Sequence, residues 1–291
     1  MKQIQQITIL GVGLMGGSLG LSLKENGFKG KRVGLGRRME TLEVALQCQA
    51  VDEITTDFGL ALADADLIVI CTPIDKISPM VELITVHADP LRPLILTDVG
   101  SVKVKPIQAV EKILETFPQF RFVGGHPMAG SEKTGVLSAQ ADLYQSAKCL
   151  LTPTATTSET AVAIVTELWE LVGAKIHILT PDQHDYLLAA ASHLPHLMAS
   201  VLTETVGQVS VDGETAIKFS ATGFRDTTRI AAGSPDLWNS ILLQNRTYLI
   251  PLISDLVGQL RQFQTDLQNN NEDQIRDYLT SAKRIRQALE S

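Results

Sequence analysis

Three segments of the chain concentrate side chains that can move protons or hold an anion. Two of them, 98–103 and 124–132, directly follow short apolar runs, and the third is split between 192–196 and 222–231. An imidazole titrates near neutral pH and suits acid–base chemistry, whereas a guanidinium group can bind a carboxylate bidentately. The candidate residues are Ser101, Lys103, His126, Glu132, His193, His196, Arg225 and Arg229.

Each of these segments also has an ordinary explanation. A histidine after two glycines, as at His126, is often a loop residue that only makes a hydrogen bond. His193 and His196 could pack between helices. Their i, i+3 spacing could also suit a metal ion, but no further group of ligands accompanies them, so no metal site is predicted.

The elements that must position these segments begin with a glycine-rich turn. An apolar strand predicted at 4–10 leads through a GxGxxG pattern into a helix predicted at 14–26. The first glycine permits the tight turn, the second lets the backbone approach a pyrophosphate, and the third lets helix and strand pack closely. The helix N-terminus then offers free N–H groups and a partial positive charge to the phosphates. A dinucleotide is predicted to contact Gly11, Gly13, Leu14, Met15 and Gly16; a glycine-rich turn without a ligand is the alternative.

The end of the second predicted strand indicates which dinucleotide is bound. NAD enzymes usually have an acidic residue there for the ribose 2′-hydroxyl, but this chain has Arg37 and Arg38 and no acid before Glu40. Paired guanidinium groups can hold a 2′-phosphate, which predicts NADP; two surface arginines at a helix start are the alternative. Thr72 and Pro73 end the next central strand, and both are expected beside the cofactor, as is Ser101.

Alternating short apolar runs and amphipathic stretches are typical of parallel βαβ units. They predict an α/β, Rossmann-like doubly wound domain over residues 1–180. The remaining strands are predicted at 31–35, 67–71, 93–98, 121–124, 149–152 and 175–178, with a helix at 158–172.

The pattern changes after residue 180, where long helices replace strands. We predict helices at 183–206, 237–263 and 272–289, which together form an all-α domain over 181–291. Their wide apolar stripes need another helical layer to cover them. A homodimer interface would supply that layer, and a self-contained bundle is the alternative.

Composition excludes several classes of protein. A net charge of −7 argues against a nucleic-acid binder. Cys48, Cys71 and Cys149 are too few and too scattered for a disulfide framework, which favours a reducing cytoplasm. The sequence has no long apolar run that would indicate a signal peptide or a membrane span.

The chain resembles the prephenate/arogenate dehydrogenase family of tyrosine biosynthesis in four motifs, which occur in the same order along nearly the whole chain. These motifs lie at 98–103, 126–132, 192–196 and 223–231. The resemblance implies oxidative decarboxylation of a cyclohexadienol to a phenol, on a Rossmann-like domain followed by a helical dimerisation domain. We expect no fused mutase or regulatory domain of the kind that some relatives carry.

The resemblance also implies roles for individual residues. His126 matches the histidine that bonds the ring hydroxyl, with Ser101 supporting it, and Arg229 matches the arginine that binds the ring carboxylate. Arg225 stands where relatives have lysine, and either contacts substrate or forms a salt bridge with Asp226.

Three assignments are less direct. His196 is the candidate for a second substrate contact, while His193 could only orient its helix. Lys103 could face either cofactor or substrate.

The substrate side chain separates the two activities of the family. Arogenate carries an ammonium group that favours a nearby carboxylate, and Glu132 is the nearest acid in these motifs, although it could equally cap a helix. Together with the arginine pair it favours an NADP-dependent arogenate dehydrogenase over a prephenate or dual-specificity enzyme. A β-hydroxyacid-type dehydrogenase and a non-catalytic NADP sensor are the competing classes.

Overall fold

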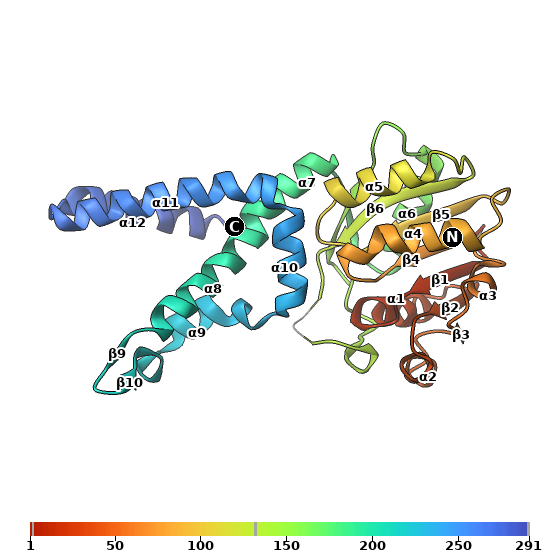
Figure 1. Cartoon of the computed structure of the whole chain (residues 1–291), viewed down its shortest axis with the longest axis horizontal. Coiled ribbons are helices and arrows are strands. Elements are labelled where there is room, and N and C mark those ends of the chain that lie inside the picture. Colours follow the sequence, from red (N-terminus) through yellow and green to blue (C-terminus); the bar gives the residue numbers. More distant parts are fainter. Residues whose placement is uncertain (2, 131–132, 290–291) are drawn as a thin grey trace.

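The computed structural model describes residues 1, 3–130 and 133–289. Up to residue 178 the described chain forms one eight-stranded sheet with helices on both faces (Figure 1). The strand order is β3-β2-β1-β4-β5-β6-β7-β8. This order reverses direction between β1 and β4, which confirms the predicted doubly wound arrangement. The strands are β1 (Gln6–Leu10), β2 (Lys31–Leu35), β3 (Glu53–Thr55), β4 (Leu67–Ile70), β5 (Leu94–Asp98), β6 (Phe120–Pro127), β7 (Lys148–Thr152) and β8 (Lys175–Ile178).

The central strands are apolar because both of their faces are buried. In β4, Leu67 and Val69 point into one core cluster, and Ile68 and Ile70 point into the other. Helices α1, α2 and α6 contribute to the first cluster, and α3, α4 and α5 to the second. These helices are α1 (Leu14–Glu25), α2 (Met39–Gln47), α3 (Phe58–Leu62), α4 (Ile77–His87), α5 (Val104–Leu114) and α6 (Glu159–Leu171).

One edge of the sheet departs from simple parallel winding. The strands from β3 to β6 pair in parallel, but β7 runs antiparallel to β6, and β8 is parallel to β7. β6 also extends to Pro127, beyond the predicted end at residue 124, because its last four residues pair with β7. His126 therefore lies in a strand rather than in a loop.

The helical part begins at a well-defined cap. Thr180 and Gln183 form a capping box, and Pro181 occupies the first turn of α7. After it the described chain is helical except for a two-stranded hairpin. Its elements are α7 (Pro181–Leu188), a π-helical turn η3 (Ala189–His193), α8 (Leu194–Gly207), β9 (Ser210–Val211), β10 (Glu214–Thr215), η4 (Ala216–Phe219), α9 (Thr222–Thr228), η5 (Arg229–Ala232), α10 (Pro235–Gln244), α11 (Arg246–Gln268) and α12 (Glu272–Gln287).

The single helix predicted at 237–263 is wrong. Two helices occupy this range, α10 and α11, and they meet at a sharp corner at Asn245 (Figure 1). The Asn245 side chain is buried and bonds to groups on α7 and η3, and this tertiary contact outweighs the continuous helical pattern.

The helix predicted at 183–206 is present but contains the π-helical turn η3. Pro195 lacks a backbone N–H and cannot complete the α-helical bond to Ala191. A wider turn just before a proline relieves that conflict.

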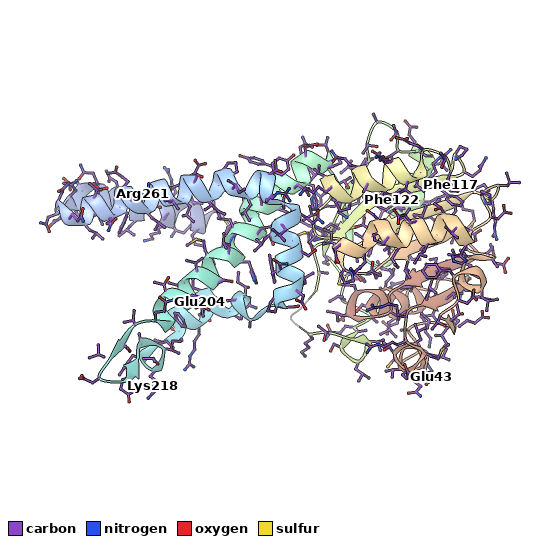
Figure 2. The ribbon with its side chains drawn as sticks, in the orientation of Figure 1. Glu43, Phe117, Phe122, Glu204, Lys218 and Arg261 are labelled. Atoms are coloured by element: carbon purple, nitrogen blue, oxygen red, sulfur yellow. The ribbon has the colours of Figure 1, made fainter. Side chains whose placement is uncertain are left out.

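The helical part extends away from the sheet as an arm with very little core of its own (Figure 1). Glu204, Lys218 and Arg261 mark parts of this arm that lie far from the sheet (Figure 2). From residue 194 onwards, the buried apolar residues of the described chain are only Ala199, Ile241 and Leu249. Within the described ranges, no helix combines the length and apolar character needed to cross a membrane.

Candidate active site

The glycine turn has the geometry that a pyrophosphate requires. Gly11 adopts a left-handed φ of +97°, and a side chain there would lie 2.9 Å from the Cys71 carbonyl oxygen. A Cβ on Gly16 would overlap the Gly11 carbonyl, whereas a Cβ on Gly13 would meet nothing within 4 Å. Gly13 is also the N-cap of α1, and no side chain in the described chain caps the first N–H groups of that helix. These residues fit a dinucleotide.

The other predicted cofactor residues lie at the same edge of the sheet. Arg37 and Arg38 follow β2 after Gly36, and both are exposed. Thr72 and Pro73 follow β4 after Cys71, and the buried Thr72 Oγ1 has no hydrogen-bond partner in the described chain. Since parallel strands end at a common edge, these groups lie at the same edge as the glycine turn. Ser101 follows β5 at this edge and is half-buried.

His126 is held in place by close packing of its own strand. A Cβ on Gly124 would lie 2.5 Å from Thr152 Oγ1, and a Cβ on Gly125 would lie 2.8 Å from the Asp98 carbonyl oxygen. The two glycines therefore let β6 approach its neighbours, and the His126 ring is left only 8% exposed. No hydrogen bond from Ser101 to His126 is found among the described residues, so that supporting contact stays a prediction.

His126 is part of a buried chain of hydrogen-bonding side chains. Its Nδ1 lies 2.8 Å from Nε2 of His184, and the His184 Nδ1 lies 2.8 Å from Oδ1 of Asp185. The two imidazole rings are 5.1 Å apart at their centroids and tilted by 57°. Asp185 also accepts hydrogen bonds from the backbone N–H groups of Lys103 and Val104, at 2.7 and 2.9 Å.

Lys103 is buried in an ion pair within the sheet. Its Nζ donates to the Asp98 carboxylate and, at 2.7 Å, to the carbonyl oxygen of Gly125, and both side chains of this ion pair are completely buried. Asp98 also accepts from the Gly125 N–H at 3.0 Å. The pair therefore fixes β5 to β6 directly beneath His126.

The two histidines beyond α7 have different surroundings. His193 Nδ1 lies 2.9 Å from Asn245 Nδ2, which also donates to the Asp185 carbonyl oxygen at 2.8 Å. The His196 ring stacks on Trp238 with centroids 3.5 Å apart, and its buried Nδ1 has no partner in the described chain. His193 is thus tied into the histidine cluster, while His196 keeps a free polar atom.

For Arg225 and Arg229, no contact with the His126 cluster is found among the described residues. Arg225 on α9 and Arg229 at the start of η5 are exposed. No hydrogen bond or ion pair of either guanidinium is found among the described residues, and the alternative salt bridge from Arg225 to Asp226 is not formed. Glu132 lies outside the described residues. The described side chains contain no group of three potential metal ligands.

Three functional candidates escaped sequence reasoning: His184, Asp185 and Trp238. His184 and Asp185 lie 58 and 59 positions after His126, inside the helix predicted at 183–206. A histidine next to an aspartate at the start of that helix was the one available signal.

Burial keeps the clustered imidazoles neutral. Burial is the main cause that holds the pKa of His126 well below its usual value of 6.5, and His184, Lys103 and His193 add to it. Burial likewise lowers the pKa of His184, against the opposing effect of Asp185, and lowers the pKa of His193 to about 4. A neutral His126 can accept a proton.

The free energy of unfolding is expected to fall as the pH drops from 6.5 towards 4. Unfolded imidazoles take up protons near pH 6.5, whereas folded His193 does so only near pH 4, so the unfolded state binds more protons in this window. Above pH 6.5 both states are neutral and the effect vanishes. Calorimetric melting temperatures across this range test it, and His193→Asn should flatten the slope. A melting temperature that stays constant or rises on acidification would contradict the expectation.

A dinucleotide-binding sheet with a buried, neutral imidazole at its carboxyl edge defines the class of oxidoreductases that use a nicotinamide cofactor. Comparison with known proteins narrows this class. The model of the prephenate dehydrogenase nucleotide-binding domain matches residues 19–185, and the model of the prephenate dehydrogenase dimerization domain matches residues 180–281.

Individual relatives agree with the domain models. A prephenate dehydrogenase of Bacillus subtilis is 32% identical over 291 residues, covering 99% of this chain and 77% of that protein. The crystal structure of A. aeolicus prephenate dehydrogenase with hydroxyphenyl propionate and NAD+ superposes with a TM-score of 0.91, at 32% identity and 98% coverage of both chains. The Synechocystis arogenate dehydrogenase structure gives a TM-score of 0.82 at 32% identity, over 97% of this chain and 98% of that one.

The chain therefore belongs to the prephenate dehydrogenase family of tyrosine biosynthesis. It is an NAD(P)-dependent dehydrogenase whose oxidation is coupled to decarboxylation. This membership decides against the β-hydroxyacid and sensor alternatives.

Proposed function

We propose that this enzyme is an NADP-dependent arogenate dehydrogenase, which converts arogenate to tyrosine with release of carbon dioxide. The observation that carries the reaction class is the buried, neutral His126 at the carboxyl edge of the sheet. The cofactor preference is supported by Arg37 and Arg38, which follow β2 with no acidic residue before Glu40. The second candidate is a prephenate or dual-specificity dehydrogenase, favoured by the equal 32% identity to relatives with either name.

His126 would act as the base for the ring hydroxyl. A nicotinamide dinucleotide held by the glycine turn would supply the hydride acceptor for the substrate C4 carbon. As the C4 hydride leaves and the hydroxyl proton passes to His126, the C4–O group would become a carbonyl, and the resulting vinylogous β-keto acid would lose carbon dioxide as the ring becomes aromatic. Ser101, at the same edge, would position the hydroxyl.

Arg229 and His196 would hold the substrate from the helical side. A guanidinium without a partner, as at Arg229, is free to form a bidentate pair with the ring carboxylate. The unpaired Nδ1 of His196 can contact the substrate side chain. Arg225 and Glu132 are proposed as further contacts, with Glu132 facing the arogenate ammonium.

Replacing Arg229 with methionine is expected to raise KM for the substrate by about 10- to 100-fold, the equivalent of one lost charge-assisted hydrogen-bonding group. The reason is that the planar fork is lost while the aliphatic stem is kept. Steady-state kinetics with Arg276→Met as a matched surface control test this. An unchanged KM would remove Arg229 from the substrate site.

A comparison of arogenate and prephenate, each with NADP and NAD, tests the proposed specificity. The highest kcat/KM is expected for arogenate with NADP. If prephenate with NAD wins, the specificity proposal fails, while the fold and the reaction class stand.

We propose that the chain divides into a nucleotide-binding domain of residues 1–180 and a helical domain of residues 181–291. The helical domain would form the interface of a homodimer. Its buried apolar residues are too few for a core, and several apolar side chains on α11 and α12 are more than half exposed. These are Ile250, Leu260, Leu267, Leu279 and Ile285. The matching family model describes a dimerization domain.

Sedimentation at micromolar concentration is expected to give twice the mass of 31.6 kDa. The double variant Leu260→Glu/Leu267→Glu should shift the mass towards one chain, and Lys29→Glu on the other domain serves as the control. A wild-type monomer would contradict the homodimer.

A further inference from the structure

We propose that His184 and Asp185 are positioning residues that act through His126. In this inference they fix the His126 proton on Nδ1, leave the Nε2 lone pair free to accept a proton, and stabilise the imidazolium that then forms. The inference rests on the proposed function, in which His126 is the base.

The assignment of protons starts at Asp185. Its two carboxylate oxygens accept the backbone N–H groups of Lys103 and Val104 at the start of α5. An ionised carboxylate with these two donors has no proton to give. The 2.8 Å contact with His184 must therefore be a donation from the His184 Nδ1–H to Asp185.

The same logic carries along the chain to His126. A neutral His184 with its proton on Nδ1 has only a lone pair on Nε2. The 2.8 Å contact between this Nε2 and the His126 Nδ1 must then be a donation from His126. A neutral His126 has one ring proton, so its Nε2 keeps the free lone pair.

Around the His126 and His184 rings, Asp185 is the negative group that can balance the charge of a protonated His126. The other ionisable groups facing the rings from the packed elements are already paired among the described residues. Lys103 and Asp98 neutralise each other, and His193 is held by Asn245. When the substrate O–H bond breaks and an N–H bond forms at Nε2, the new charge is shared through His184 towards the Asp185 carboxylate. A buried imidazolium without such a partner would be costly.

The arrangement also joins a base on the sheet to orienting groups on α7, the first helix after the sheet. Asp185 on α7 binds the N-terminus of α5, and Asn245 at the α10–α11 corner donates to the Asp185 carbonyl oxygen. Docking of the helical region therefore sets the tautomer of His126.

Nitrogen-15 NMR of histidine-labelled whole enzyme, without substrate, tests the tautomer directly. We expect the His126 signals to show a protonated Nδ1 and an unprotonated Nε2 near pH 7.5. In His184→Phe, which removes the acceptor, we expect the two His126 tautomers to exchange. A wild-type His126 with its proton on Nε2, or an unchanged spectrum in His184→Phe, would overturn the inference.

Kinetics on matched variants supply the second readout. His184→Phe is expected to lower kcat by about 10²–10⁴-fold, because a catalytic imidazole in the wrong tautomer cannot accept the proton. KM should change far less. His184→Gln keeps an acceptor oxygen for His126 Nδ1, so it should retain the tautomer and part of the activity. This variant tests the inference even if His184→Phe fails to fold. The exposed His177→Phe is the control. Equal kcat in wild type and both His184 variants would contradict the inference.

The two proposals fail in distinguishable ways. If wild type turns over neither cyclohexadienol but His126 shows the expected tautomer, the proposed function fails and the hydrogen-bond chain stands. If turnover is normal and the tautomer is reversed, only the positioning role fails.

Discussion

Replacing His126 with asparagine is expected to lower kcat by about 10²–10⁴-fold while leaving NADP affinity close to that of wild type. Asparagine is similar in size to part of the imidazole ring and can still hydrogen-bond, but it cannot accept a proton near neutral pH. The hydrogen bond of the His126 ring goes to His184 and not to the glycine turn proposed to hold the cofactor, so the loss should be confined to catalysis. Steady-state kinetics and a fluorescence titration with NADPH measure the two effects separately.

The exposed His177→Asn provides the control for this experiment. A melting temperature near that of wild type establishes that β6 still packs against β5 and β7. Near-normal turnover in His126→Asn would mean that another group removes the hydroxyl proton, and the proposed mechanism would be wrong.

The double variant Arg37→Ser/Arg38→Ser is expected to raise KM for NADP by about 10²-fold or more, because each charge-assisted hydrogen bond to a phosphate contributes about 1.5–3 kcal/mol. KM for NAD should stay within about threefold, since NAD lacks the 2′-phosphate. Both arginines are exposed at the end of β2, so the fold should tolerate the change.

Lys29→Ser removes an exposed positive charge from the same domain and controls for general electrostatic attraction. Equal losses with NADP and NAD would show that the arginines do not bind the 2′-phosphate. No loss with either cofactor would exclude them from the cofactor site.

Features with a local cause could be predicted from the sequence. The glycine turn, the strands β1, β2, β4 and β5 and the start of α7 depend on neighbouring residues, and the structure confirms them within two positions, whereas the short edge strand β3 was not predicted. The hairpin at β9–β10 also had a local signal, because Asp212 and Gly213 both adopt a positive φ that suits a tight turn. That signal was present in the sequence but was missed.

Features with a tertiary cause could not be predicted in this way. The corner at Asn245 depends on bonds to residues 52 and 60 positions earlier, which a periodic apolar pattern does not contain. His184 and Asp185 gain their importance only when α7 packs against β6 and α5. The role of Lys103 could not be predicted either, because only the fold shows that its charge is neutralised by Asp98. Sequence thus located the residues near the chemistry but not the groups that orient them.

The most direct test of the proposed reaction is a simultaneous measurement of NADPH formation and carbon dioxide release from arogenate. We predict that the two products appear at the same rate and in a one-to-one ratio, together with tyrosine. Reduction of NADP without carbon dioxide, or no product from either arogenate or prephenate, would contradict oxidative decarboxylation as the function of this enzyme.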